Sequence, residues 1–521
     1  MTALSLSDER VTFRTWAGFS AMGLGMFMAI LDIQVVATSL PEIRSALDIP
    51  PDRMSWVQTA YLIAEVISIP LTGWLTRMLT MRVLFTAAIT VFTMASIGCA
   101  ASTGFASLAL WRVLQGFAGG TLIPAVFAAV FLLFPKKQEQ VATTIAGVLA
   151  VLAPILGPIV GGWITQTFSW HWLFLINVVP GIAAGTVGLF CMAHERPDFG
   201  LARAFDWVAL LSAAVCLAAL EIGLKEAPHR GWLSPGIFAI FVLFMASGGL
   251  FVRRTLQAPT PIVDLSALDD RRLAVGCALS FLTGFGLYGS VYLMPVFLSF
   301  VRGHGSLRIG EIMLVTGVAQ LVSAPLVIQA ERRIDAVTLT AIGFVLFGLG
   351  LGLSAFQPRA ADFQEMFWPQ VIRGVAIMLC LLPPIRVALG HLPPERVPDA
   401  SSLFNLMRNL GGAVGLALID TVIWTRAPEH SRILLARLKD GDVDAARAIG
   451  IRESFLSGPL PSPDNPLVQA YVRPLLERAG LAAATNEAWA MIASFVLLGP
   501  IILILSRFAR QPTSIGDHSS A

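Results

Sequence analysis

Apolar segments long enough to cross a lipid bilayer recur along the whole chain. A hydrocarbon core about 30 Å thick requires a helix of about 20 residues, and hydropathy indicates about fourteen such spans. They cover residues 14–39, 55–76, 83–102, 106–133, 141–167, 171–193, 207–224, 235–252, 273–300, 309–330, 336–356, 366–390, 401–424 and 487–507. Backbone amides inside a bilayer must be hydrogen-bonded within the protein, so spans of this length form helices. The sequence therefore predicts an all-α polytopic membrane protein.

Composition and the first span exclude other classes of protein. Hydrophobic residues make up 56% of the 521 residues and charged residues only 13%, whereas a soluble domain is about one-quarter charged. The first span is too long for a cleavable signal peptide and is interrupted by Asp32. The 5 cysteines lie singly in apolar spans without a C-x-x-C pair, so we expect neither a bound metal nor disulfides. We expect no nucleic-acid partner, because the basic residues are spread over loops.

Lysine and arginine residues gather in loops on one side of the predicted membrane. They are Arg10, Arg14, Arg77, Arg82, Lys136, Lys137, Arg253, Arg254, Arg271, Arg272, Arg332 and Arg333. The opposite short loops are poorer in these residues, and those around Thr103 and Ser169 have none. The positive-inside rule then predicts that both termini lie in the cytoplasm, which requires an even number of spans.

The two halves of the chain resemble each other at a separation of about 255 to 258 residues. Ser68–Leu71 matches Ser323–Leu326, and Arg112–Gly116 matches Gln370–Gly374 with arginine and glutamine exchanged. Such a repeat predicts two related helical bundles with a substrate cavity between them.

The repeat and the polar stretches predict five regions. These are a cytoplasmic N-terminus (1–13), an N-terminal six-helix bundle (14–193), a linker with two extra spans (194–272), a C-terminal six-helix bundle (273–507) that includes an outer hydrophilic segment (425–486), and a cytoplasmic tail (508–521).

Four acidic residues fall within predicted spans, where a carboxylate is costly unless it is functional or paired. Asp32 lies about two turns before the outer end of its span, and we expect it to exchange protons or recognise a cation. Glu65 and Asp420 are further candidates for a substrate cavity, whereas Glu221 is as well explained by a place at the membrane surface. For Asp32 the alternative is a structural carboxylate that braces a neighbouring helix.

Basic residues also occur within the spans. Arg112 cannot deprotonate and needs a partner or a water-filled cavity; it could tune a nearby acid or simply brace two helices. Arg373 and Arg408 are similar residues in the second half. These arginines would suit an anionic substrate, whereas Asp32 and Glu65 would suit a cation, so the sequence leaves the substrate's charge open.

The fifth span is rich in glycine and proline between residues 147 and 162. Pro154, Gly157, Pro158, Gly161 and Gly162 allow close helix packing and a bend. We therefore expect this helix to form the surface on which the two bundles rock, although small residues also serve for packing alone.

Motifs for other energy sources or for catalysis are absent from the sequence. There is no G-x-x-x-x-G-K loop for ATP, no H-E-x-x-H and no G-x-S-x-G. We expect a transporter that is not an enzyme and has no cofactor besides protons as the coupling ion.

Several motifs resemble those of the major facilitator superfamily, specifically its 14-helix drug:proton antiporters of the EmrB/QacA type. The matching segments are Leu31–Pro41 for L-D-x-T-x-x-x-x-A-L-P, Leu110–Gly116 for R-x-x-Q-G with Arg112 and Gln115, Ala153–Gly162 for G-P-x-x-G-G, and Trp170–Pro180 for W-x-W-x-F-x-I-N-x-P. One motif departs, because Gly73–Arg82 lacks the acid and the second glycine of G-x-L-x-D-R-x-G-R-R. The family's charge pair at the cytoplasmic face is thus left without its usual acid.

The resemblance implies an exporter of amphipathic compounds in a bacterial inner membrane, driven by proton antiport and alternating access. Asp32, Glu65, Arg112, Gln115, Asp420, Arg373 and Arg408 are the candidate proton-coupling and substrate residues. By similarity to EmrB-like pumps, a periplasmic membrane-fusion adaptor and an outer-membrane channel are expected partners. The alternative is a dedicated exporter or importer of one metabolite, such as a fatty acid, siderophore or sugar derivative. A polytopic membrane enzyme is a remote alternative.

Overall fold

A computed structural model describes residues 11–50, 53–54, 56–203, 205–258, 261–451 and 466–508. Within these ranges the regular elements are helices, and 13 of them are long and apolar enough to cross a membrane. The longest, α3 (Trp56–Ala100), is interrupted at Thr80, whose φ of 71° and ψ of 158° are not helical. Because α3 therefore carries two of the predicted spans, each of the spans expected from hydropathy is found as helix. The predicted fold class is confirmed.

The helices follow the order of the predicted spans. The first part of the chain forms α1 (Phe13–Thr38), α2 (Leu40–Ala46), α3, α4 (Phe105–Leu133), α5 (Lys136–Thr167), α6 (Trp172–Leu175), α7 (Val178–Cys191) and α8 (Gly200–Arg203). Two helices follow, α9 (Trp207–Arg230) and α10 (Pro235–Gln257). The second part forms η2 (Leu265–Asp269), α11 (Arg271–Val296), η3 (Phe297–Val301), α12 (Ser306–Glu331), α13 (Ala336–Ser354), α14 (Phe363–Leu389), α15 (Val397–Lys439), α16 (Val443–Ala448), α17 (Pro466–Val496) and α18 (Leu498–Phe508).

Helix α5 joins the two halves, since it packs on α1 of the first half and on α12 and α14 of the second. The contacts are close on both sides. A Cβ added to Gly157 would overlap Gln34 of α1, and one added to Gly310 of α12 would overlap Ile159 of α5. On the other side of the molecule, α15 lies against α3 and α4. The two halves therefore meet along two helix seams.

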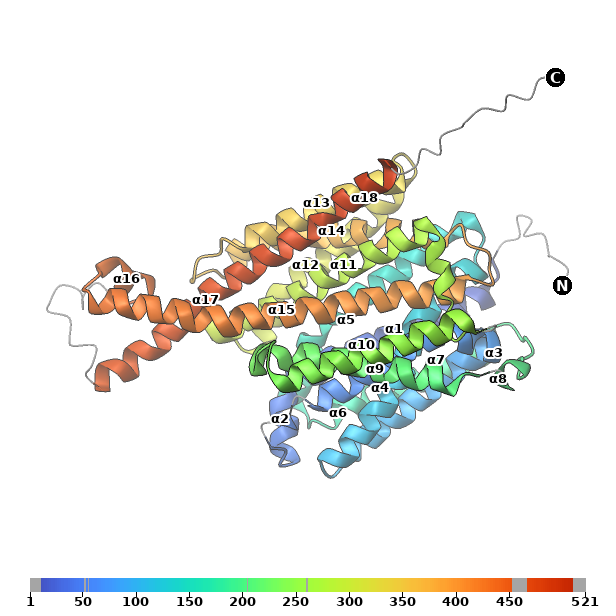
Figure 1. The fold of residues 1–521 in the computed structure, drawn as a ribbon, viewed down its shortest axis with the longest axis horizontal. Coiled ribbons are helices and arrows are strands. Elements are labelled where there is room, and N and C mark those ends of the chain that lie inside the picture. Colours follow the sequence, from blue (N-terminus) through green and yellow to red (C-terminus); the bar gives the residue numbers. More distant parts are fainter. Residues whose placement is uncertain are drawn as a thin grey trace, which may run out of the picture.

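Helices α9 and α10 form a pair that lies outside these seams (Figure 1). Asp206 caps α9 by accepting hydrogen bonds from the amides of Val208 and Ala209, each at 3.0 Å. Arg254 of α10 donates to the same carboxylate at 3.0 and 3.1 Å. The Arg254 hydrogen bond and the helix-capping amides hold the pKa of Asp206 below its usual range. Helix α9 then reaches inward to contact α3 and α15.

Helices α15 and α17 extend together beyond the bundle, with α16 at the tip of the projection (Figure 1). Arg426 and His430 of α15 each bond to Glu487 of α17 at 2.7 Å. Ile449, Leu476 and Ala479 form a small apolar core between the helices. Much of the predicted hydrophilic segment 425–486 is thus helical, while residues 452–465 lie outside the described part.

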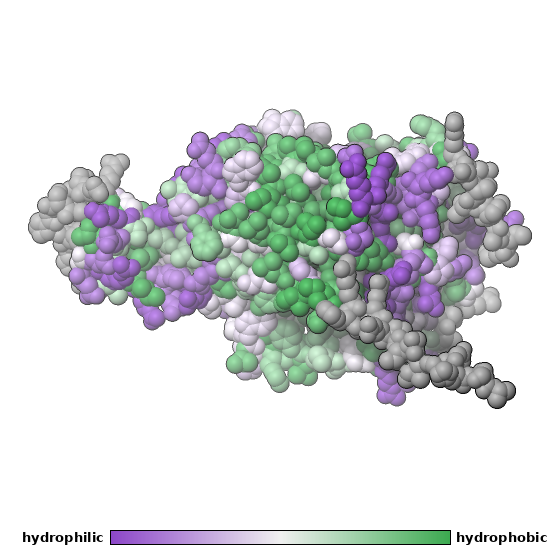
Figure 2. Space-filling view, turned by 90° about the horizontal axis from the view of Figure 1, so that it is seen from above, coloured by the Kyte–Doolittle hydropathy of each residue, from purple (hydrophilic) through white to green (hydrophobic). Residues whose placement is uncertain are grey.

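The surface carries a band of apolar side chains between two polar ends (Figure 2). The start of α1 and the end of α18 lie at the same end of the molecule (Figure 1), in keeping with an even number of spans. Most of the predicted terminal segments 1–13 and 508–521 falls outside the described residues.

Candidate functional site

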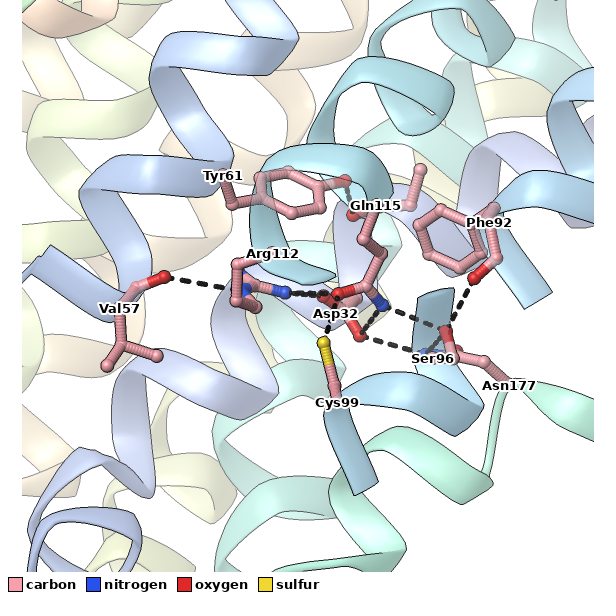
Figure 3. A network of polar contacts seen from close by, with 10 residues as sticks. Asp32, Val57, Tyr61, Phe92, Ser96, Cys99, Arg112, Gln115 and Asn177 are labelled. Atoms are coloured by element: carbon pink, nitrogen blue, oxygen red, sulfur yellow. Dashed lines mark hydrogen bonds and ion pairs between the residues drawn. The ribbon is translucent and has the colours of Figure 1, made fainter. Parts of the chain in front are cut away.

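Asp32 lies at the centre of a buried polar network in the first half (Figure 3). Its side chain has no exposed area, and it forms an ion pair with Arg112, which is equally buried. The Nε2 group of Gln115 donates to one carboxylate oxygen at 2.9 Å, and Nδ2 of Asn177 donates to the same oxygen at 2.8 Å. The carboxylate is thus held by one cation and two amides.

Two helices and one residue outside them bring these groups together. Asp32 comes from α1, while Arg112 and Gln115 lie one turn apart on α4, three residues being the spacing that places two side chains on one helix face. Asn177 precedes α7, and its side chain does not cap that helix. Its amide is therefore available to Asp32.

A second layer of contacts fixes Arg112. Its Nη1 group donates to Oε1 of Gln115 at 2.7 Å, and its Nε group donates to the carbonyl of Val57 at 3.3 Å. The guanidinium carbon lies 4.2 Å from the centre of the Tyr61 ring, a cation–π geometry. Gln115 in turn donates to Ser96 at 2.9 Å. The arrangement can hold a buried carboxylate in ionised form and can respond when that carboxylate takes up a proton.

Glu65 lies nearer the seam between the halves. Its side chain is 3% exposed, and the charged groups that act on it are Glu221, Arg112 and Arg408. Arg408 of α15 bonds to Asn405 and lies with its guanidinium 5.4 Å from the Phe127 ring of α4.

Glu221 of α9 lies beside the part of α3 that contains Glu65. Leu217, one turn before it on α9, packs against the apolar cluster that Val66 and Ile69 of α3 form with Leu406 of α15. Lys225, one turn after it, donates to Thr59 at 2.6 Å. Two contacts of antiparallel helices thus bracket Glu221 and place it beside the α3 segment that contains Glu65.

The structure does not bring Arg373 and Asp420 into the Asp32 network. Arg373 of α14 is 2% exposed, with its guanidinium 4.7 Å from the Trp489 ring and Nη2 3.4 Å from the sulfur of Met294. Asp420 of α15 accepts a hydrogen bond from the hydroxyl of Tyr292 of α11 at 2.7 Å. The candidate residues therefore form one network and two separate positions, with Glu65 and Arg408 between the halves.

The glycine- and proline-rich stretch stays helical throughout. Pro154, Gly157, Pro158, Gly161 and Gly162 are all buried inside α5. Gly157 is the contact with Gln34 of α1 described above. The helix thus presents small residues to its neighbours without a break.

The segment Gly73–Arg82, which differs from the family's loop motif, also contributes a charge pair. Arg77, at the position where the motif has its acid, forms an ion pair with Asp399 in the first turn of α15. Gly73 packs directly against Asp399. Near the same end of the molecule, Arg386 of α14 bonds to Glu331 of α12 at 2.5 Å, and Gln140 of α5 donates to that carboxylate at 2.7 Å. Polar contacts between the halves are therefore present despite the altered motif.

A profile described as the Major Facilitator Superfamily matches residues 22–416. The chain belongs to the major facilitator superfamily. It is 39% identical over 420 residues to the colistin resistance protein EmrB of Acinetobacter baumannii, covering 80% of this chain and 82% of the relative. It is 28% identical over 506 residues to the multidrug export protein EmrB of Escherichia coli, covering 95% of each.

Two further similarities complete the comparison. The fatty acid resistance protein FarB of Neisseria gonorrhoeae is 31% identical over 421 residues, covering 80% of this chain and 82% of the relative. The crystal structure of the human organic anion transporter MFSD10 matches with a TM-score of 0.60 and 14% identity, covering 94% of this chain and 99% of that one. That likeness concerns the fold. The relatives confirm the EmrB type of the superfamily and point to a multi-pass transporter of a bacterial inner membrane, and to a transporter rather than an enzyme.

Sequence reasoning missed part of the Asp32 network. Ser96, Cys99 and Tyr61 were not singled out, although Cys99 lies 3.6 Å from Oε1 of Gln115 and Tyr61 stacks on Arg112. Asn177 was noted only as part of a motif. A polar residue at the end of a loop, just before an apolar helix, was the signal that could have identified it.

Proposed function

We propose that the protein exports hydrophobic and amphipathic compounds across the bacterial inner membrane in exchange for protons. The observation that carries this proposal is the fully buried Asp32–Arg112 pair with its amide donors, inside a chain of the EmrB type. A carboxylate at membrane depth is kept only where it serves transport or pairing. Here the acid is paired with an arginine that stays charged, so Asp32 is the member of the pair that can take up and release a proton.

Protonation of Asp32 is the proposed switch. A proton on the carboxylate removes the ion pair, while Arg112 keeps its bonds to Gln115 and the Val57 carbonyl. Breaking a buried ion pair costs about 3–5 kcal/mol, and one charge crossing a potential of about 100 mV supplies about 2.3 kcal/mol. Because the two energies are of the same order, proton entry can shift the balance between two arrangements of the network.

The movement that follows is alternating access of the two halves. Helix α5 is the proposed rocking surface, since its glycines and prolines lie at contacts with both halves. The Arg77–Asp399 pair and the Gln140–Glu331 hydrogen bond, which both join the two halves, would separate when the cavity opens toward that end. By the positive-inside rule, this end and both termini face the cytoplasm.

The proposed partners follow from the projection of α15 and α17. These helices project at the end opposite the start of α1 (Figure 1), which is the periplasmic end in the proposed orientation. A membrane-fusion adaptor and an outer-membrane channel are the partners we propose for it. Multidrug export and colistin resistance in the names of two relatives support a broad substrate range, whereas fatty acid resistance in a third supports the alternative of a dedicated exporter.

Dye efflux from bacterial cells that lack their own major pumps tests the proposal. Cells that express the wild type should expel ethidium, a protonophore should stop the efflux, and Asp32→Asn should abolish it. Glu311→Gln, which changes an exposed acid paired with Arg308, is the matched control and should expel the dye normally. Efflux that continues in the presence of the protonophore, or in Asp32→Asn, would contradict proton coupling through Asp32.

A further inference from the structure

A small cavity lies in the second half, at its border with α5. Its wall comes from α11, α12 and α14, and Ile155 of α5 closes it from the first half. Its polar lining is Ser290, Thr316, Gln320, Gln370 and Arg373. The rest of the lining is aliphatic or methionine. The described residues that line it include no carboxylate.

Three hydrogen-bond donors on this lining have no partner within the protein. They are Nη1 of Arg373, Nε2 of Gln370 and Nε2 of Gln320. All three side chains are 2% exposed or less. Both polar atoms of Gln320 lack a partner, so its amide can turn either way. Buried donors are almost always satisfied in proteins, and one left unpaired costs about 1–3 kcal/mol. Three at one cavity indicate a ligand that accepts hydrogen bonds.

The charge at the cavity is positive and uncompensated by the lining. Within the described part of the chain, the guanidinium of Arg373 lies against the sulfur of Met294 and the ring of Trp489, neither of which carries a charge. The hydroxyl of Thr316 donates to Oε1 of Gln370 at 3.0 Å. The NH2 group of Gln370 is left without a partner. A water molecule accepts about two hydrogen bonds, whereas a carboxylate has about four acceptor positions and a negative charge. The donor set therefore fits a carboxylate.

The internal repeat shows what is missing at this position. One separation along the chain relates Arg112 to Gln370 and Gln115 to Arg373. The same separation relates Asp32 to Ser290. Ser290 lines the cavity beside Arg373, just as Asp32 lies beside Arg112 in the first half. The second half thus keeps the arginine and the glutamine of the network but has a serine hydroxyl in place of the acid.

We propose that this cavity binds the carboxylate of an amphipathic anionic substrate, which takes the place that Asp32 has in the first half. The guanidinium of Arg373 and the amides of Gln370 and Gln320 hold the headgroup, and the apolar tail lies along the seam beside Ile155. This inference rests on the proposed export function and names one of its substrate classes. Because Ile155 belongs to the glycine- and proline-rich stretch of α5, an occupant also contacts the surface on which the halves move.

Binding of laurate to the purified full-length protein tests the inference, with dodecyltrimethylammonium as a cation with the same length of alkyl chain. Arg373→Gln should weaken laurate binding at least tenfold, because it removes the charge, and should leave binding of the cation unchanged. Arg308→Gln removes an exposed positive charge from α12 of the same half and is the matched control; it should bind laurate as the wild type does. Equal laurate affinity in Arg373→Gln and the wild type would overturn the inference.

A second variant keeps the test valid if Arg373→Gln fails to fold. Gln320→Met removes both unpaired polar atoms at similar length. It should raise the thermal midpoint of the ligand-free protein and weaken laurate binding several-fold. A Gln320 that only braced the helices would lower the midpoint instead, and that result would contradict the assignment.

Three further outcomes separate the alternatives. Displacement of laurate by a large excess of sodium chloride would overturn the carboxylate assignment in favour of a small inorganic anion. A wild type that expels ethidium with protons but does not bind laurate would refute this inference and leave the proposed export function standing. A wild type that binds laurate but shows no proton-dependent efflux of ethidium or laurate would refute the export function while the anion site survives.

Discussion

The two halves of the molecule hold corresponding arginines in opposite electrostatic conditions. In the first half, Arg112 is neutralised by Asp32, and Gln115 bonds to both. In the second half, Arg373 is as deeply buried but lies between a methionine sulfur and a tryptophan ring. The first arginine has a counter-ion within the protein, although its Nη2 group has no hydrogen-bond partner, whereas the second arginine has no counter-ion among the described residues that line its cavity.

This difference separates two roles that a buried arginine can have in a transporter. An arginine with its own acid is suited to a proton switch, because the acid can be neutralised and the arginine stays held. An arginine without an acid is suited to an anionic ligand, because only a charge from outside can neutralise it. A duplicated bundle can in this way supply both the coupling site and the substrate site.

The largest effect should come from removing each arginine in turn. Arg112→Met leaves Asp32 buried without a counter-ion and should lower the free energy of unfolding by about 3–5 kcal/mol. Arg373→Met removes an unpaired charge and should leave stability unchanged or raise it by about 1 kcal/mol. Thermal unfolding of the ligand-free proteins in detergent gives the comparison. Equal losses in the two variants would show that the halves do not differ in the way described.

A transplanted acid should make the second half resemble the first. Ser290→Asp places a carboxylate beside Arg373, and a charged hydrogen bond of this kind stabilises by about 1.5–3 kcal/mol. The same acid should compete with laurate and weaken its binding at least tenfold. Ser290→Asn, which has the same shape without the charge, should leave most of the binding intact. Undiminished laurate binding by Ser290→Asp would break the proposed equivalence of the two sites.

The smallest effect concerns the turns that join the second and third spans of each half. In the first half, Thr80 has a φ of 71°, which favours glycine, whereas the described turn after Glu331 in the second half has no positive φ. Thr80→Gly should therefore raise the unfolding free energy by about 1 kcal/mol. Thr80→Ala keeps the side-chain Cβ and should give no such gain. A gain from both substitutions would assign the effect to the lost hydroxyl, which is buried without a partner.

Much of the fold could be predicted from the sequence because hydropathy reports the spans directly. The Asp32–Arg112–Gln115 cluster could also be predicted, since charged and polar residues are costly in apolar helices and therefore indicate function or pairing. Ser96 and Tyr61 were not, because their roles depend on contacts between distant helices that no local pattern encodes. The replacement of the acid by Ser290 could have been predicted as well, since the repeat that pairs Gln115 with Arg373 also pairs Asp32 with Ser290.

The α15–α17 projection shows the limit of hydropathy in another way. The polarity of segment 425–486 indicates a hydrophilic loop, yet the segment is rich in alanine, leucine and arginine. These residues are strong helix formers, so the spans continue as helix after their polarity rises. Polarity marks where a helix leaves the membrane, and it does not mark where the helix ends.

The central claim is that Asp32 exchanges a proton for substrate. The most direct measurement is substrate-triggered proton release from inside-out vesicles that have been energised to an acid interior, followed with a pH-sensitive fluorescent probe. Addition of ethidium to vesicles with the wild type should dequench the probe, and vesicles with folded Asp32→Asn should give no response. Dequenching of equal size with Asp32→Asn would contradict the account.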